Sequence, residues 1–214
     1  IQDFKNLKIT DYEIENKYNV KDNYQWKIKL QRKKNALKNF DKNLITNILY
    51  RPFDIRKIYY DEDIVFRTRK SIMLNFQDDN LGLVSVRQVA EGLFNHAFVS
   101  NTICNFRITI SNKGGAYIFP LYILQNGVEE VFFGVSEPEA VYGNKKSENG
   151  FIKIENFKPE FRKFVDNKYK KHFTAEQILG YIYAILHSET YRKKYSEFLK
   201  SDFPRILFTD SEKI

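Results

Sequence analysis

Apolar residues recur at helical spacing in the first basic segment of the chain. Between residues 23 and 38, Trp26, Leu30 and Leu37 stand four and seven positions apart, with Lys and Arg residues between them. This period predicts an amphipathic helix over 23–38 with a broad basic face. Residues 1–22 are polar and weakly patterned, which predicts a linker or the tail of a preceding domain.

The middle of the chain changes to shorter runs. Thr68–Gln77 is patterned as a helix, whereas "NLITNIL" (43–49) fits either a helical turn capped by Asp41 or a strand. Asn126-Gly127 predicts a hairpin leading into "VEEVFFGV". Runs rich in β-branched and aromatic residues predict four strands, at 55–60, 81–88, 96–101 and 116–124.

The last third returns to a helical period. Thr174 and Gln177 form a capping box that opens a helix, and a second helix begins near Ser188 and ends at Pro204. These two helices predict a helical hairpin over 173–204. The order of elements predicts an α+β fold, in which a mixed sheet domain over 23–214 carries an N-terminal basic helix and this hairpin.

Positive charge is concentrated in one segment. Between Lys27 and Tyr60 there are ten Lys and Arg residues against Asp41 and Asp54, so this segment alone carries a net charge equal to the +8 of the whole chain. A local excess of this size is typical of a polyanion partner, with nucleic acid first and an acidic membrane second. The alternative is a solvated helix face without a partner.

Other features restrict the class of protein. Cys104 is the single cysteine, which excludes an intrachain disulfide and favours a reducing compartment. Its neighbours Ile103 and Phe106 predict a buried, inert thiol. No run approaches the ~18 apolar residues of a membrane span, and no signal peptide is evident at the start. We therefore expect a cytoplasmic protein without membrane contact, and the start at Ile1 suggests a piece of a longer chain.

Residues for catalysis are scarce. The three histidines lie far apart in the sequence, so we assign no metal site, and no glycine-rich phosphate loop or nucleophile elbow is present. "DYEIENK" (Asp11–Lys17) has the order of acids and lysine that nucleases use, but it lies in a weakly patterned segment. We assign no catalytic residue and no cofactor to this chain, which indicates a binding function.

Five strings in order carry a family resemblance: "YRPFDIRKIYY", "LGLVSVRQ", "HAFVSN", "YIFPLYIL" and "ILGYIYAILHSETYRKKYSEFLKSDFPRI". Over about Tyr24–Ile206 the chain resembles the C-terminal specificity domain of type ISP and related fused type II (type IIG) restriction–modification enzymes. The resemblance implies that the chain selects a site in double-stranded DNA for an adenine-N6 methyltransferase domain of the same polypeptide, which uses S-adenosylmethionine and can be joined to a nuclease. The methyltransferase motifs themselves are absent here, so no methyl transfer is expected from this chain.

A recognition domain needs contacts to phosphates, which set position and affinity, and contacts to base edges, which carry sequence information. Lysine suits the first role, while the fork of arginine and the amides of Asn and Gln suit the second. Our candidates for phosphate contact are Lys29, Arg32, Lys33, Lys34, Arg51, Arg56, Lys57 and Lys113. Our candidates for base reading are Arg67, Arg69, Lys70, Arg87, Gln88 and Asn101.

Several of these assignments have alternatives. Arg51 or Arg56 could pair with Asp54 and hold the fold, and Arg87 and Gln88 could have architectural roles instead. The tyrosines at 181, 183, 191 and 195 fit packing better than base stacking. As a whole, the chain could instead be a protein-interaction module of a DNA-modifying complex or a binder of single-stranded nucleic acid.

Overall fold

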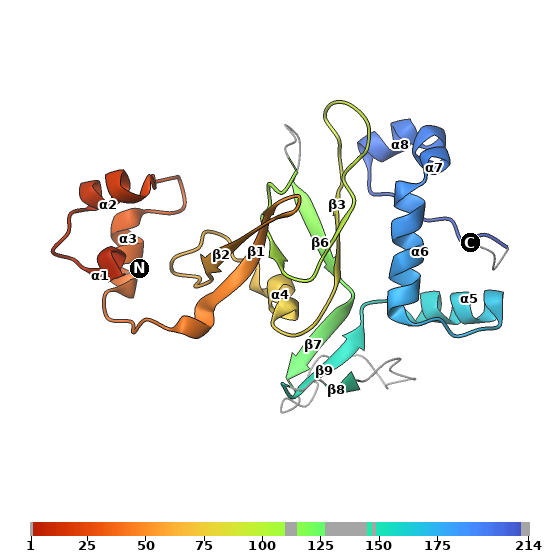
Figure 1. Ribbon diagram of the computed structural model, residues 1–214, viewed down its shortest axis with the longest axis horizontal. Coiled ribbons are helices and arrows are strands. Elements are labelled where there is room, and N and C mark those ends of the chain that lie inside the picture. The colour runs from red at the N-terminus through yellow and green to blue at the C-terminus, as the bar shows by residue number, and fades with distance from the viewer. Residues whose placement is uncertain (1, 110–114, 127–144, 147–148, 211–214) are drawn as a thin grey trace. The chain divides into compact units, whose positions relative to one another are not determined.

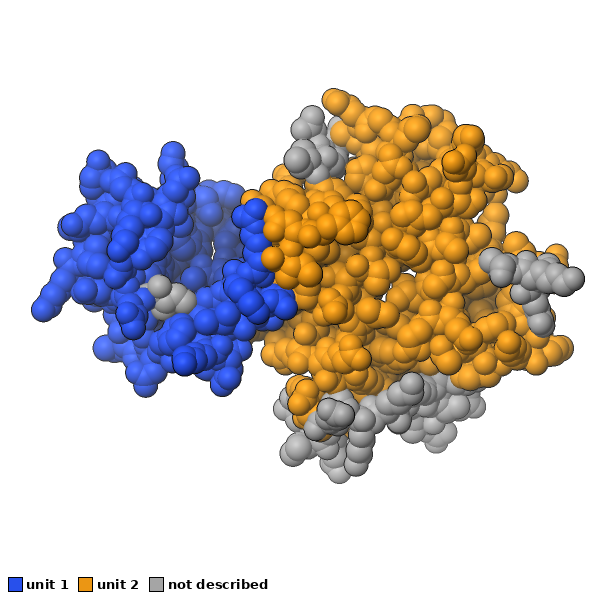
Figure 2. All heavy atoms as spheres, in the orientation of Figure 1, with its two compact units in different colours: residues 1–47, 56–69 blue, residues 48–55, 70–214 orange. Residues whose placement is uncertain are grey.

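The computed structural model describes residues 2–109, 115–126, 145–146 and 149–210. The chain divides into two compact units, which Figure 2 colours blue and orange. Unit 1 comprises residues 1–47 and 56–69, and unit 2 comprises residues 48–55 and 70–214. Both helices and small sheets are present, so the predicted α+β class is confirmed.

Unit 1 is built around three helices: α1 (Gln2–Lys5), α2 (Asp11–Tyr18) and α3 (Ile28–Asn35). The segment 1–22 thus contains two helices, although its assignment to a linker or a preceding domain stays a prediction. At the start of α2, Thr10 Oγ1 accepts from the backbone N–H of Glu13, and the Glu13 carboxylate accepts from the backbone N–H of Thr10. This reciprocal capping box fixes where α2 begins.

The basic helix α3 is shorter than the predicted span of 23–38. Side chains just before it organise a turn instead: Asn23 Oδ1 accepts from the backbone N–H of Trp26 at 2.8 Å, and Asp22 Oδ1 accepts from the backbone N–H of Ile28 at 2.8 Å. Short Asn and Asp side chains compete in this way with helical hydrogen bonds. The helix therefore begins only at Ile28.

The first sheet has the strand order β2-β1-β5, with β1 (Ile45–Arg51), β2 (Asp54–Tyr59) and β5 (Ile103–Cys104). β1 and β5 are parallel, with Leu49 opposite Cys104. The undecided segment at 43–49 adopts both structures, because the 3-10 helix η1 (Lys42–Leu44) leads directly into β1. Asp41 caps η1 by accepting from the backbone N–H of Asn43 at 2.9 Å.

The second sheet is antiparallel, with the order β4-β3-β6 formed by β3 (Gly82–Val86), β4 (Phe98–Ser100) and β6 (Ala116–Pro120). One face of this sheet packs in a core with Leu49, Ile108 and Cys104. Burial raises the pKa of the Cys104 thiol to about 12, so the thiol stays protonated and inert. The buried cysteine agrees with its sequence interpretation.

The predicted strand 116–124 is divided at Leu121, after which β7 (Tyr122–Asn126) joins a third sheet. This sheet has the order β7-β9-β8, with β8 (Lys145–Lys146) and β9 (Phe151–Glu155). Asn126, the first residue of the predicted hairpin turn, ends β7, whereas Gly127 and the predicted second strand lie outside the described residues. The predicted helix 68–77 is two short pieces, α4 (Lys70–Met73) and the 3-10 helix η2 (Leu74–Phe76).

The C-terminal part of unit 2 is helical. Figure 1 shows α6 (Ala175–His187) with α5 (Pro159–Tyr169) at one end and α7 (Glu189–Lys194) and α8 (Ser196–Ser201) at the other. The capping box of Thr174 and Gln177 is present in both directions, as predicted. The second predicted helix is broken at Tyr195 into α7 and α8. Tyr191 is buried in the core with Leu186, Leu199 and Val86.

Candidate nucleic-acid interface

Most of the net charge belongs to unit 1, where fifteen Lys and Arg residues stand against nine Asp and Glu residues. On α3, Lys29 and Lys33 are exposed, lie one helical turn apart, and make no ion pair with another described residue. Unpaired exposed lysines are available to phosphate oxygens without breaking an existing contact. Lys29 and Lys33 therefore stay candidates for phosphate contact.

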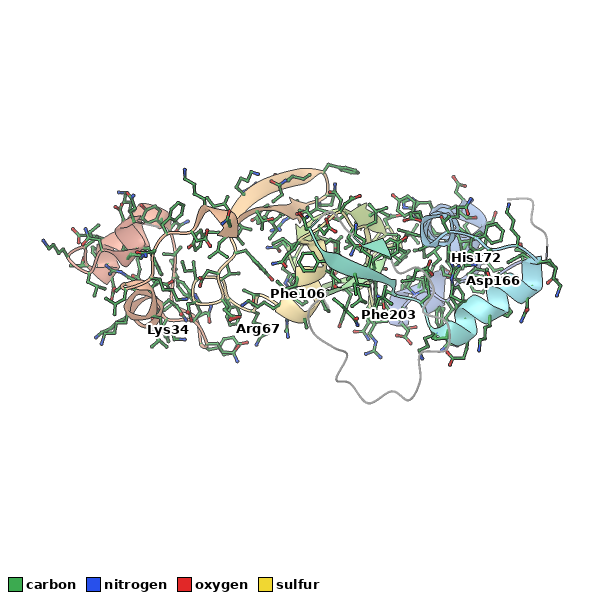
Figure 3. All side chains as sticks on the ribbon, turned by 90° about the horizontal axis from the view of Figure 1, so that it is seen from below. Lys34, Arg67, Phe106, Asp166, His172 and Phe203 are labelled. Atoms are coloured by element: carbon green, nitrogen blue, oxygen red, sulfur yellow. The ribbon has the colours of Figure 1, made fainter. Side chains whose placement is uncertain are left out.

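Other lysines near α3 are partly neutralised. Lys34 Nζ lies 3.4 Å from Asp63 Oδ1, and Lys38 hydrogen-bonds the Asp63 carboxylate. The hydrogen bond from Lys38 holds the pKa of Asp63 below its usual value and raises the pKa of Lys38. These surface pairs contribute little to stability. The carboxylate of Asp63 nevertheless neutralises part of the positive charge of Lys34, which is labelled in Figure 3.

Arg32 is not available for phosphate contact, contrary to the sequence prediction. Its side chain is only 3% exposed and bonds the carboxylate of Asp11. The guanidinium also donates to the backbone carbonyls of Phe4, Asn6 and Ile9. Five donors in a fixed fork suit a site with several acceptors, so Arg32 organises α1, α2 and α3 instead of facing solvent.

Arg67 (Figure 3) is exposed yet held in one position. Its backbone has φ 55°, and its guanidinium carbon lies 4.9 Å from the ring centroid of Phe66 and 5.9 Å from that of Tyr24. Nε and Nη2 both donate to Gln25 Oε1, at 3.1 and 2.7 Å, and Nη2 also donates to the Tyr24 hydroxyl at 2.8 Å. Nη1 donates to no other residue in the described part of the chain and is available to a ligand, and the ring contacts fix the plane of the fork. We call Arg67, Tyr24, Gln25 and Phe66 the Arg67 cage.

The two neighbouring candidates differ from Arg67. Arg69 is exposed and also has a positive φ, of 55°, which is rare for a residue with a long side chain. Lys70 is the first residue of α4, is exposed, and belongs to unit 2. Of these three base-reading candidates, only Lys70 lies in a helix, and Arg67 and Arg69 precede α4.

Three cations lie on the β1–β2 hairpin. Arg51 stacks on the ring of Tyr50, at 4.0 Å from guanidinium carbon to centroid, and donates from Nη1 to the Tyr50 carbonyl at 2.7 Å. The contacts of Arg51 are thus to Tyr50, and the alternative that Arg56 pairs with Asp54 stays a prediction. Arg56 and Lys57 are exposed on β2.

The remaining candidates are in unit 2. Arg87 follows β3, and its Nε lies 3.1 Å from Asp202 Oδ1 in an exposed ion pair. The pKa of Asp202 is lowered first by a hydrogen bond from the backbone N–H of Phe203 and second by Arg87. Gln88 is exposed beside Arg87, and Asn101 is exposed between β4 and β5. Lys113 lies outside the described residues.

The nuclease-like order at Asp11–Lys17 forms no catalytic centre in the described structure. These residues are on helix α2, where Asp11 pairs with Arg32, Glu13 caps the helix and Lys17 pairs with Asp3. Within the described ranges, no three His, Cys, Asp or Glu side chains are grouped so that they could hold a metal ion. No described helix is long and apolar enough to cross a membrane.

A family model described as the type ISP C-terminal specificity domain matches residues 1–214. The chain belongs to this family. No curated protein sequence matches the chain. Two solved structures share the fold of this specificity domain: a DrdV–DNA complex, with TM-score 0.62, and the ATP-dependent type ISP restriction–modification enzyme LlaBIII bound to DNA, with TM-score 0.64.

The specificity domain is a small part of both proteins. Each of the two is 18% identical to it; 97% of the domain aligns with DrdV and 96% with LlaBIII. It spans only 18% of the DrdV chain and 12% of the LlaBIII chain. At this level of identity the likeness establishes a common fold.

Sequence reasoning missed the partners of Arg67 in this specificity domain. Tyr24 and Gln25 lie more than forty positions away from Arg67 in the sequence, and no local period links them to it. The one signal in the sequence was that Tyr24 and Gln25, two residues with polar groups, directly precede Trp26. Trp26 itself anchors this segment by donating from Nε1 to the carbonyl of Ile64 at 2.8 Å.

Proposed function

We propose that this specificity domain recognises a sequence in double-stranded DNA on behalf of a restriction–modification enzyme. The observation that carries the proposal is the basic unit 1, in which the unpaired Lys29 and Lys33 accompany the fixed fork of Arg67. The membership of the family and the DNA-bound state of two structures with the same fold support it.

The family resemblance also implies what the rest of the enzyme does. The domain would position a target adenine for an N6 methyltransferase that uses S-adenosylmethionine and lies elsewhere in the same polypeptide. This chain contributes the choice of site and no catalytic residue. The cytoplasmic location stays a prediction.

The two kinds of contact have different candidates. Lys29 and Lys33 carry point charges on flexible stems, which suit phosphates at any sequence. Arg67 keeps a fixed orientation through Gln25 and Tyr24, so its Nη1 edge can discriminate between acceptors on base edges. We infer that α3 supplies affinity and that the Arg67 cage supplies part of the specificity.

Replacing Lys29 and Lys33 together by alanine should weaken binding to all duplex sequences alike. Each lost phosphate contact lowers the slope of log K against log[salt] by about one, so we expect the slope to fall by about two and affinity near 0.1 M salt by about tenfold per lysine. Fluorescence anisotropy with a duplex obtained by selection from a random pool, at several salt concentrations, measures both quantities.

Lys17→Ala is the matched control, because Lys17 is an exposed lysine of the same unit that is already paired with Asp3. We expect it to change the salt slope by less than either α3 lysine. Competition with single-stranded DNA and RNA belongs in the same experiment. If duplex DNA competes no better than these, or if binding is insensitive to salt, the chain is a single-strand binder or a protein-interaction module.

Replacing Arg67 by alanine should reduce the preference for the selected duplex over random duplex. A base contact by an arginine contributes about 1–3 kcal/mol of discrimination, which is roughly 5- to 150-fold in the ratio of affinities. Lys57→Ala, which removes an exposed cation of the same unit, should lower both affinities and leave their ratio unchanged. If Arg67→Ala also leaves the ratio of the two affinities unchanged, Arg67 contacts a phosphate and not a base.

A further inference from the structure

The turn between β1 and β2 contains a phenylalanine with an unusual backbone conformation. Pro52 and Phe53 form this two-residue turn, and Phe53 has φ 64°. A proline followed by a positive φ is the pattern of a type II turn, whose third position normally holds glycine or asparagine. For a bulky aromatic residue, this region of φ is disfavoured because its Cβ crowds the backbone.

The strain is accompanied by nearly complete exposure. The Phe53 side chain is 94% exposed, and the nearest ring, that of Phe98, lies edge-on at 6.4 Å between centroids. Packing within unit 2 therefore does not compensate for the backbone conformation. Residues held in sparsely populated backbone conformations cluster at functional sites, so this exposed ring is a candidate contact for a partner.

The charges around the turn indicate what kind of partner it fits. The segment 50–57 carries Arg51, Arg56 and Lys57 against the single carboxylate of Asp54. Arg51 is kept beside the turn by its stack on Tyr50. An apolar tip flanked by cations matches a duplex, which offers phosphates on its outside and stacked, apolar base faces within.

We propose that Phe53 is a wedge that inserts between two adjacent base pairs of bound duplex DNA and partly unstacks them. The inference rests on the proposed function and deepens it, because it concerns the shape of the bound DNA and not its sequence. Apolar side chains used in this way kink a duplex by roughly 20–90°. Pro52 limits the freedom of the turn, so the ring is oriented before the DNA arrives.

The test uses the full 214-residue chain and a duplex selected from a random pool, with 2-aminopurine placed at successive positions. The wild-type complex should show a several-fold rise in 2-aminopurine fluorescence at one base step, and energy transfer between the duplex ends should report a bend. Phe53→Asn should abolish both signals. Asparagine tolerates a positive φ, so this variant keeps the turn and removes only the wedge.

Two further variants test whether the effect belongs to the Phe53 ring. Leu37→Asn removes an apolar residue that follows α3 and is 97% exposed, and it should change neither signal. Phe53→Leu should retain much of both. If the wild-type complex forms on duplex DNA without unstacking, or Phe53→Asn unstacks it equally, the wedge is refuted and the proposed function stands. If Phe53→Asn instead impairs only docking to a catalytic protein domain, the ring serves a protein pocket and the wedge is refuted. If no duplex is bound at all, the proposed function fails, and the wedge with it.

Discussion

Replacing Arg32 by alanine should lower the free energy of unfolding of unit 1 by about 3 kcal/mol. The change removes the partner of Asp11 and leaves the carbonyls of Phe4, Asn6 and Ile9 without their donor inside the protein. An acceptor left unsatisfied in a buried place costs about 1–3 kcal/mol, and breaking a buried ion pair costs about 3–5 kcal/mol. The partial exposure of Asp11, 42%, places the estimate at the lower end of that range.

The chain provides its own probe for this measurement. Trp26 is the single tryptophan, and its indole is bonded to Ile64 within unit 1, so urea unfolding followed by its fluorescence reports on this unit. Lys33→Ala is the control, because it removes the adjacent cation from the exposed side of the same helix and should change stability by no more than about 0.5 kcal/mol. Equal stability of the two variants would contradict the anchoring role of Arg32.

The contrast between Arg32 and Lys33 shows what the sequence could not provide. The period of Trp26, Leu30 and Leu37 correctly indicated a helix but suggested that these residues face inward. In the structure α3 buries Ile28, Gln31, Arg32 and Asn35, while Leu37 is 97% exposed. The buried face is polar because carbonyls of residues 4–9 require donors, and that requirement comes from distant parts of the chain.

Helix caps and strands that depend on neighbouring residues in the sequence were predicted well. The capping box at Thr174 and the strands near 55–60, 81–88 and 96–101 depend on residues within a few positions of one another, and all are present within a few residues of the predicted bounds. The candidate site was predicted less well, because it depends on contacts across the chain. Charge identified the segment that contains Lys29 and Lys33, but the cage that holds Arg67 became visible only in the structure.

A second buried arginine should have an effect as large as that of Arg32, in unit 2. Arg162 on α5 is 1% exposed, and its Nε lies 2.8 Å from Oε2 of Glu155, which ends β9 and is itself buried. Nη2 also donates to the carbonyl of Phe173 at 2.8 Å, just before α6. Replacing Arg162 by methionine leaves a buried carboxylate without its cation, so we expect a loss of about 3–5 kcal/mol. Thermal unfolding followed by near-ultraviolet circular dichroism measures it.

A double variant separates the ion pair from the packing around it. Arg162→Met with Glu155→Leu removes both charges from the interior, and replacing a buried pair by apolar residues of similar volume is often neutral or stabilising. We therefore expect the double variant to regain most of the stability that the single variant loses. His172 lies beside Asp166 (Figure 3) and also contacts Arg162, and it keeps its contact with Asp166 in both variants. If the double variant is as unstable as Arg162→Met, the guanidinium acts mainly through the carbonyl of Phe173, and the joint between β9, α5 and α6 depends on that hydrogen bond instead of on the charge pair.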